Sequence, residues 1–122
     1  MRDPGNEQKA CAETHGIFRL LGKSHMLDIL AKFTREGPGP RRFVDLQSSL
    51  AISPNTLSGR LKELVQAGLL SRTVYNEIPP RVDYEATQKA LDLCPVFEAL
   101  SDWALKHRLD LPSAETAVAE AA

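Results

Sequence analysis

The chain has 122 residues, 43% of them hydrophobic, and its 15 basic and 16 acidic side chains leave a net charge of −1. A chain of this size can bury one hydrophobic core, and no repeat suggests a second. No apolar run approaches the roughly eighteen residues of a membrane span, and the N-terminus lacks the apolar segment of a signal peptide. We therefore expect one cytoplasmic domain that does not contact a membrane.

Three short helices are predicted in the first half of the chain, over residues 14–21, 25–35 and 43–50. Gly22 ends the first helix, and Ser24 is the expected cap of the second. Between the second and the third, residues 37–42 (Gly-Pro-Gly-Pro-Arg-Arg) should form a stiff loop, because each proline disfavours the α conformation in the residue before it.

A fourth helix begins at Ser53, whose hydroxyl can accept a bond from a first-turn amide, and Pro54 suits the first helical position. Its apolar face is formed by leucines at helical spacing, Leu57, Leu61 and Leu64. Gly68 follows, where the end of a helix favours a left-handed residue. This helix buries leucine and exposes polar side chains.

Two strands are predicted after that helix. Residues 69–75 contain the β-branched and aromatic residues that strands prefer, and residues 81–87 alternate, with Arg81 and Asp83 on the polar side. The prolines within residues 76–80 lack amide donors, so this segment is a turn. A helix followed at once by a hairpin indicates an α+β fold, mostly α: a winged helix-turn-helix with a two-stranded β wing and added terminal helices.

A longer helix is expected over residues 88–107, with Pro95 restarting it rather than kinking it. Its apolar residues occupy more than one stripe, which is more than a small core requires. Residues 1–10 and 109–122 lack large apolar residues at a useful spacing, so we expect flexible tails around one domain at residues 11–108.

Basic side chains gather in the middle of the chain, although the total charge argues weakly against nucleic acid, since neutralised phosphates supply most non-specific affinity. Residues 41–81 include six basic and three acidic side chains. The cations are Arg41, Arg42, Arg60, Lys62, Arg72 and Arg81. A local basic face is therefore available.

The sequence resembles the HxlR-type winged helix-turn-helix transcriptional regulators over residues 11–103. The matching positions are Cys11, Leu21-Gly22-Lys23, Arg42-Phe43, Leu46, Ile52-Ser53, Leu57, the run from Arg60 to Leu64, Gly68-Leu69, the run from Pro79 to Val82, Tyr84, Thr87 and Trp103. Three positions depart from the family's usual residues: Ser24 replaces tryptophan, Ala86 leucine and Ala90 glycine. The loop at residues 37–40 also looks longer than is usual in the family.

The resemblance implies a DNA-binding homodimer whose terminal helices form the interface, and in some members the N-terminal cysteine senses oxidants or electrophiles. We expect an interface that includes Ile17, Phe18, Leu21, Phe97, Leu100 and Trp103. A symmetric dimer would bind double-stranded DNA at an inverted-repeat operator.

The predicted DNA contacts lie on the fourth helix and the hairpin: Ser53, Asn55, Thr56, Ser58, Gly59, Arg60, Lys62, Arg72 and Arg81. Arginine can bond both acceptors of guanine, so Arg60 is the candidate base reader, and Arg72 and Arg81 could enter a minor groove or hold phosphate. The alternatives stay open: Arg60 could be solvated or paired with Glu63, and Gly59 could permit a close backbone approach or merely be tolerated.

Cys11 is the redox candidate, because it precedes the first predicted helix, where a helix N-terminus can lower the pKa of a thiol. Cys94 is expected to be a small core residue. A metal-responsive alternative would use Cys11 and His15, which are four residues apart, with His25, Cys94 and His107 as conceivable partners. No recognised ligand pair supports it, so we predict neither metal nor cofactor.

Catalysis has no support, since the sequence contains no phosphate-binding glycine loop, nucleophile elbow or HExxH motif. We expect a sequence-specific transcriptional regulator and not an enzyme. The alternative from another functional class is a winged helix that contacts a partner protein with the same helix and wing.

Overall fold

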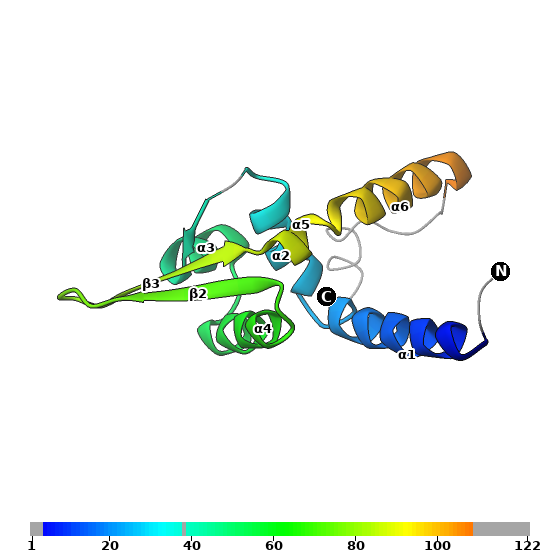
Figure 1. Ribbon diagram of the computed structural model, residues 1–122. Coiled ribbons are helices and arrows are strands. Elements are labelled where there is room, and N and C mark those ends of the chain that lie inside the picture. Colours follow the sequence, from blue (N-terminus) through cyan, green and yellow to red (C-terminus); the bar gives the residue numbers. More distant parts are fainter. Residues whose placement is uncertain (1–3, 38, 109–122) are drawn as a thin grey trace. The chain divides into compact units, whose positions relative to one another are not determined.

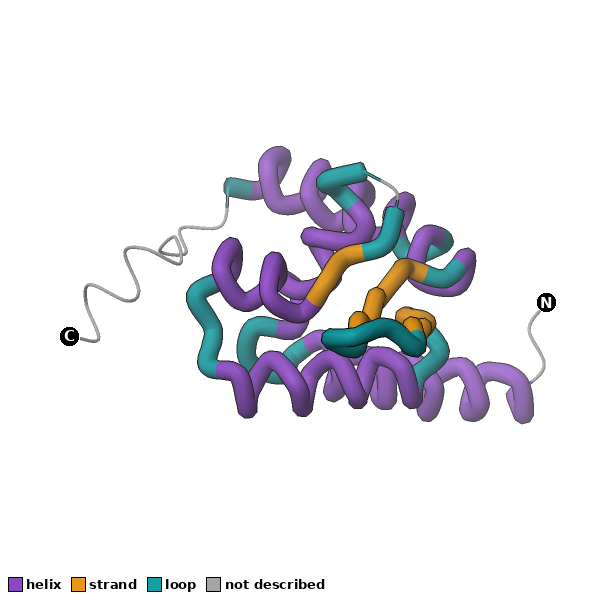
Figure 2. Tube along the Cα trace, turned by 90° about the vertical axis from the view of Figure 1, so that its left-hand side faces the viewer, coloured by secondary structure: helices purple, strands orange, loops and turns teal. Residues whose placement is uncertain are grey.

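The computed structural model describes residues 4–37 and 39–108, and helices make up most of them (Figures 1 and 2). The elements in chain order are α1 (Pro4–Leu21), α2 (Met26–Thr34), β1 (Arg41–Arg42), α3 (Phe43–Leu50), α4 (Pro54–Gln66), β2 (Leu70–Tyr75), β3 (Arg81–Ala86), α5 (Gln88–Leu91) and α6 (Cys94–His107). The chain divides after Leu91 into two compact units, the first with α1 to α5 and the second with α6.

The core of the first unit is formed by α2, α3, α4 and the start of β2. Its fully buried large side chains are Met26, Ile29, Leu30, Leu46, Leu57, Leu61 and Leu64. Three of these are the leucines predicted for one face of α4, so the amphipathic pattern of that helix is confirmed. The predicted bounds of α3 also agree with the structure.

The sheet has three antiparallel strands in the order β1-β3-β2, one more than the predicted two-stranded wing. Arg41 and Arg42, expected in a loop, pair with Tyr84 and Asp83 of β3. A strand of two residues is too short for alternation to reveal it in a sequence. The β2–β3 hairpin pairs from Leu70 and Ala86 outwards, and it extends beyond α3 and α4 to a free tip (Figure 1).

Helix starts differ most from the predictions. α1 begins at Pro4 and not at residue 14, so residues 4–10, expected as tail, are helical. These residues were missed because good helix formers such as Glu7 and Ala10 give no apolar stripe when the turn is exposed. The rest of the expected tails, residues 1–3 and 109–122, lies outside the described residues.

Two other ends are corrected by the structure. The N-cap of α2 is His25 with a left-handed φ of 65°, and Ser24, the predicted cap, bonds elsewhere. The helix predicted over residues 88–107 is interrupted between α5 and α6, and Pro95 stands in the first turn of α6 as expected for a restart. In the part of the chain that the structure describes, no helix is long and apolar enough to cross a membrane.

Gly68 ends α4 as predicted, with a φ of 78°. The Gly68 amide donates to Val65 O at 3.0 Å, and the Leu69 amide donates to Leu64 O at 2.9 Å. This is the Schellman arrangement, in which the residue after the helix end is left-handed. It turns the chain directly from α4 into β2.

We expect Gly68→Ala to lower the free energy of unfolding by about 1–2 kcal/mol, because an L side chain is strained at this φ. Gly59→Ala is the matched control: a Cβ at Gly59 meets nothing within 4 Å, so alanine should stabilise α4 by about 1 kcal/mol. Urea titration of both variants measures the difference. A Gly68→Ala protein that was as stable as Gly59→Ala, or more stable, would contradict the assigned helix end.

Candidate nucleic-acid interface

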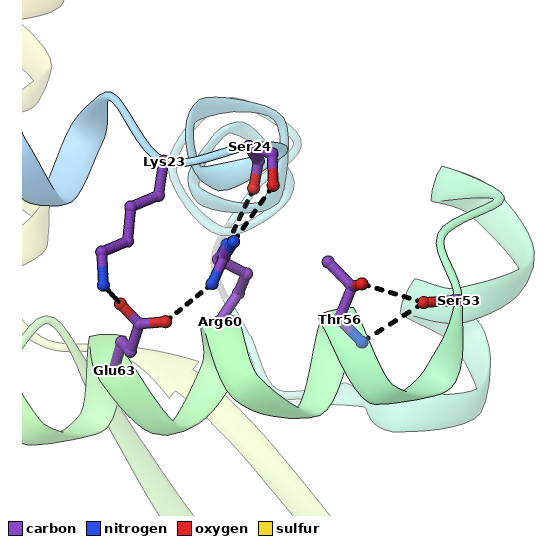
Figure 3. Close-up of polar contacts among 6 residues, drawn as sticks. All are labelled: Lys23, Ser24, Ser53, Thr56, Arg60 and Glu63. Atoms are coloured by element: carbon purple, nitrogen blue, oxygen red, sulfur yellow. Dashed lines mark hydrogen bonds and ion pairs between the residues drawn. The ribbon is translucent and has the colours of Figure 1, made fainter.

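α4 starts with the cap that the sequence predicts. The Ser53 hydroxyl accepts from the Thr56 amide at 3.3 Å and donates to Thr56 Oγ1 at 2.9 Å (Figure 3). The two hydroxyls therefore hold each other and close the first turn. Both lie at the amino end of the helix, where backbone amides favour an anion.

The polar side of α4 is a row of exposed side chains, Asn55, Ser58 and Lys62, which we call the outer stripe. The spacing of three and four residues puts these side chains on one face, away from the buried leucines. Gly59 lies beside the row and is half-buried, with open space where a Cβ would be. Lys62 makes no ion pair with another residue in the described part of the chain.

Arg60 does not belong to the outer stripe. Its Nε donates to Ser24 O at 2.9 Å, Nη2 donates to Ser24 Oγ at 3.0 Å, and Nη1 donates to Glu63 Oε1 at 2.8 Å (Figure 3). The other oxygen of Glu63 binds Lys23. The pairing of Arg60 with Glu63 that the sequence left open is therefore present. The other partners, Lys23 for Glu63 and Ser24 for Arg60, come from the turn between α1 and α2.

The charge of Glu63 is stabilised by its two cations. The Lys23 ammonium first, and then the Arg60 guanidinium, hold the pKa of the Glu63 carboxyl below its usual value of 4.5, while partial burial opposes them. Sequence spacing could reveal the Arg60–Glu63 pair at i,i+3, but Lys23 and Ser24 stand too far away along the chain for any local pattern to connect them.

The wing contains a buried carboxylate, although the sequence analysis placed this residue only on the polar side of its strand. Asp83 of β3 is 7% exposed and lies 3.5 Å from Arg81 Nε and 4.0 Å from Arg42 Nε. The guanidinium of Arg81 also stacks over the ring of Tyr75, with its Cζ 4.1 Å from the ring centroid. Arg81 is thereby restrained at the base of the turn, whereas Arg72 is exposed and has no ion pair among the described residues.

A depression of about 410 Å³ separates the wing loop from the start of α3. Its lining includes both arginines that contact Asp83, together with Val44, Ile78 and Pro80. Ile78 is fully exposed at the tip. The depression is therefore lined by apolar side chains, by two arginines and by Glu77.

The cysteines do not stand where the sequence analysis placed them. Cys11 is exposed in the middle of α1, so the argument from a helix start does not apply to it. Cys94 is half-buried at the first position of α6 rather than in a core. His15 lies one turn after Cys11, and no group of three or more potential metal ligands occurs within residues 4–37 and 39–108.

Comparison with known proteins agrees with this geometry. The family model described as HxlR-like helix-turn-helix matches residues 20–110. A transcriptional regulator of Halalkalibacterium halodurans is 41% identical over 70 residues, which are 57% of this chain and 62% of that protein. Another from Methanothermobacter thermautotrophicus is 31% identical over 102 residues, covering 83% of this chain and 75% of that protein.

Among solved structures, the chain is similar to the transcriptional regulator YodB of Bacillus subtilis. The reduced form of YodB matches at a TM-score of 0.67 with 32% identity, over 85% of this chain and 92% of YodB. The diamide-treated form matches at 0.61 with 31% identity, over 87% and 95%. The chain thus belongs to the HxlR-like helix-turn-helix family and is a transcriptional regulator of the helix-turn-helix type.

Proposed function

We propose that the protein binds a specific double-stranded DNA operator as a homodimer, with α4 in the major groove and the β2–β3 hairpin over the neighbouring minor groove. The observation that carries this proposal is the division of α4 into a buried leucine face and the exposed outer stripe. A helix with that division can insert its polar side into a groove without exposing the core.

The side chains of the outer stripe suit base and phosphate contacts. Asn55 can bond both N6 and N7 of adenine, and Ser58 can bond either type of base edge. Lys62 can bond guanine or a phosphate. Ser53, Thr56 and Gly59 lie near the amino end and the outer side of the helix, where we assign phosphate contact to the first two and a close backbone approach to Gly59.

The wing supplies cations of two kinds. Arg72 is exposed and unpaired among the described residues, so its guanidinium is available for a minor groove. Arg81 is fixed by Tyr75 and Asp83, so we assign it a phosphate contact that needs little side-chain ordering.

Asn55→Ala should weaken operator binding by about 1–3 kcal/mol and relax preference at one base pair, since a base contact carries sequence information. Arg72→Ala should weaken all duplexes alike and reduce the salt dependence by about one unit of slope, because it removes a phosphate or groove cation. Titration of operator and scrambled duplexes at several salt concentrations measures both.

Lys9→Ala, which removes an exposed cation from α1, is the control and should leave binding unchanged. An Asn55→Ala protein with wild-type affinity and preference would contradict the placement of α4. If gel shifts against chromosomal fragments found no salt-sensitive binding at all, the winged-helix interaction module would be favoured instead.

The dimer proposal rests on apolar side chains that the described chain leaves uncovered. Phe18 on α1 is 66% exposed, and Leu100 and Trp103 on α6 are 61% and 49% exposed. α6 has no buried residue at all. We propose that a second copy covers these side chains together with Ile17, Leu21 and Phe97, in an isologous interface that favours an inverted-repeat operator with half-sites about 10 bp apart or a multiple of that.

Leu100→Asp should convert the dimer to a monomer at micromolar concentration, because it puts a charge into an apolar interface. The matched control is Leu105→Asp, since Leu105 is also exposed but lies on another side of α6 from the proposed interface. Light scattering gives the mass of each variant. A wild-type monomer, or equal effects of the two substitutions, would contradict this interface.

We also propose that oxidation of Cys11 changes DNA binding, supported by its exposed thiol and by the existence of reduced and diamide-treated structures of YodB. Diamide takes two electrons and two protons as two thiols become one disulfide. The two thiols would be Cys11 of one protomer and the same residue of the second copy, and a disulfide between them would move one protomer against the other and prevent simultaneous engagement of two half-sites.

Mild diamide treatment should change operator affinity by about tenfold or more in the wild type and in Cys94→Ser, but not in Cys11→Ser. Titration before and after treatment, followed by reduction with dithiothreitol, measures the change and its reversal. A response of Cys11→Ser equal to that of the wild type would leave Cys11 as an ordinary residue of α1.

A further inference from the structure

Four polar residues tie the recognition helix to the turn after α1, and we call them the α4 clamp: Lys23, Ser24, Arg60 and Glu63 (Figure 3). Each nitrogen of the Arg60 guanidinium donates to a protein oxygen, and each oxygen of the Glu63 carboxylate meets a cation. The side chains of Arg60 and Glu63 are only 22% and 24% exposed. The cluster is closed on itself rather than open to a ligand.

The turn that receives Arg60 is itself held by backbone bonds. The Gly22 amide donates to Phe18 O at 2.9 Å, and the Met26 amide donates to Lys23 O at 3.1 Å. A Cβ at Gly22 would lie 3.0 Å from Phe18 O, so the chain passes closely over the end of α1. Met26, which follows the turn, is fully buried. The carbonyl of Ser24 is therefore an acceptor at a fixed position.

The position of Arg60 around α4 also separates it from the outer stripe. Consecutive residues of an α-helix are about 100° apart, so Arg60 lies roughly 140° around the axis from Asn55, beside the leucine face. Reading guanine requires two arginine donors. The three bonds of Arg60 use three of its five N–H groups and hold the guanidinium against Ser24, so reading a base on the side of the outer stripe would require the side chain to swing away from Ser24.

We propose that Arg60 and Glu63 are positioning residues: they fix the angle at which α4 presents Asn55, Ser58 and Lys62, and Arg60 itself reads no base. This inference rests on the proposed DNA-binding role of α4. It assigns sequence preference to the outer stripe and overall affinity to the α4 clamp.

The test is a double-mutant cycle of Arg60→Ala and Glu63→Ala, measured against the operator and every single-base variant of it. Each substitution should lower affinity by about tenfold for all duplexes alike, and the double variant should be little weaker than either single one, because one unit is lost in each case. Asn55→Ala should instead alter the preference at one base pair. Circular dichroism at the assay temperature checks that each variant is folded.

Two gentler substitutions keep the test informative if alanine unfolds the protein. Arg60→Lys retains the charge but replaces the planar guanidinium, whose three nitrogens bond both oxygens of Ser24 and Glu63, by a single nitrogen, so it should not restore affinity. Ser24→Ala removes one bond and leaves the carbonyl acceptor, so it should have a smaller effect than Arg60→Lys.

A base-reading role for Arg60 would show as a change of preference at one base pair in Arg60→Ala, with full affinity retained by Glu63→Ala, and that result would overturn the inference. Failure of the proposed DNA-binding role of α4 would give a different result, in which Asn55→Ala and Lys62→Ala leave DNA binding unchanged as well.

The pH dependence of stability gives a second readout. Because the pKa of Glu63 is lower in the folded protein than its usual 4.5, its ionised form stabilises the fold above pH 4.5, and this contribution is lost as the pH falls through the lowered value. Glu63→Gln should therefore reduce the melting temperature at neutral pH, and the difference from wild type should shrink in acid. A difference that stayed constant with pH would overturn the ionic role of Glu63.

Discussion

Burial of three leucines on one face of α4 determines where the candidate DNA contacts of that helix lie. Leu57, Leu61 and Leu64 are inaccessible to solvent, and each contributes about 1.5–3 kcal/mol by leaving water. Rotation of α4 about its axis would expose them. The leucines thus fix which side of the helix faces outwards, and the outer stripe faces outwards because it stands opposite them.

Hydrophobic burial fixes the rotation of α4 but constrains its tilt less well, because apolar contacts are not directional. Polar bonds at specific places can supply the direction. The Schellman turn at Gly68 joins the carboxyl end of α4 to β2, and the bonds of Arg60 join its flank to the turn at Ser24. These bonds join α4 both to β2 and to the turn that immediately follows α1.

The sequence allowed the fold and helix α4 to be predicted because their signals are local. The cap at Ser53, the leucine spacing and the glycine at residue 68 act within one or two turns, and all appear in the structure. Strand β1 and the ion pair between Arg42 and Asp83 could not be predicted, because they join residues about forty positions apart. For the same reason the sequence offers Arg60 as a candidate base reader but does not reveal its bonds to Ser24, which stands 36 positions earlier in the chain.

Ser24 stands where the resemblance leads us to expect tryptophan, and the structure shows what a small polar residue does at that place. Its backbone carbonyl would accept from Arg60 with any side chain at this position, whereas its hydroxyl adds a second acceptor for the same guanidinium. A large aromatic ring would hold the turn by burial instead. In this chain directional bonds to an arginine of α4 take the place of that burial, so the turn after α1 is joined to α4 through hydrogen bonds that define an orientation as well as a contact.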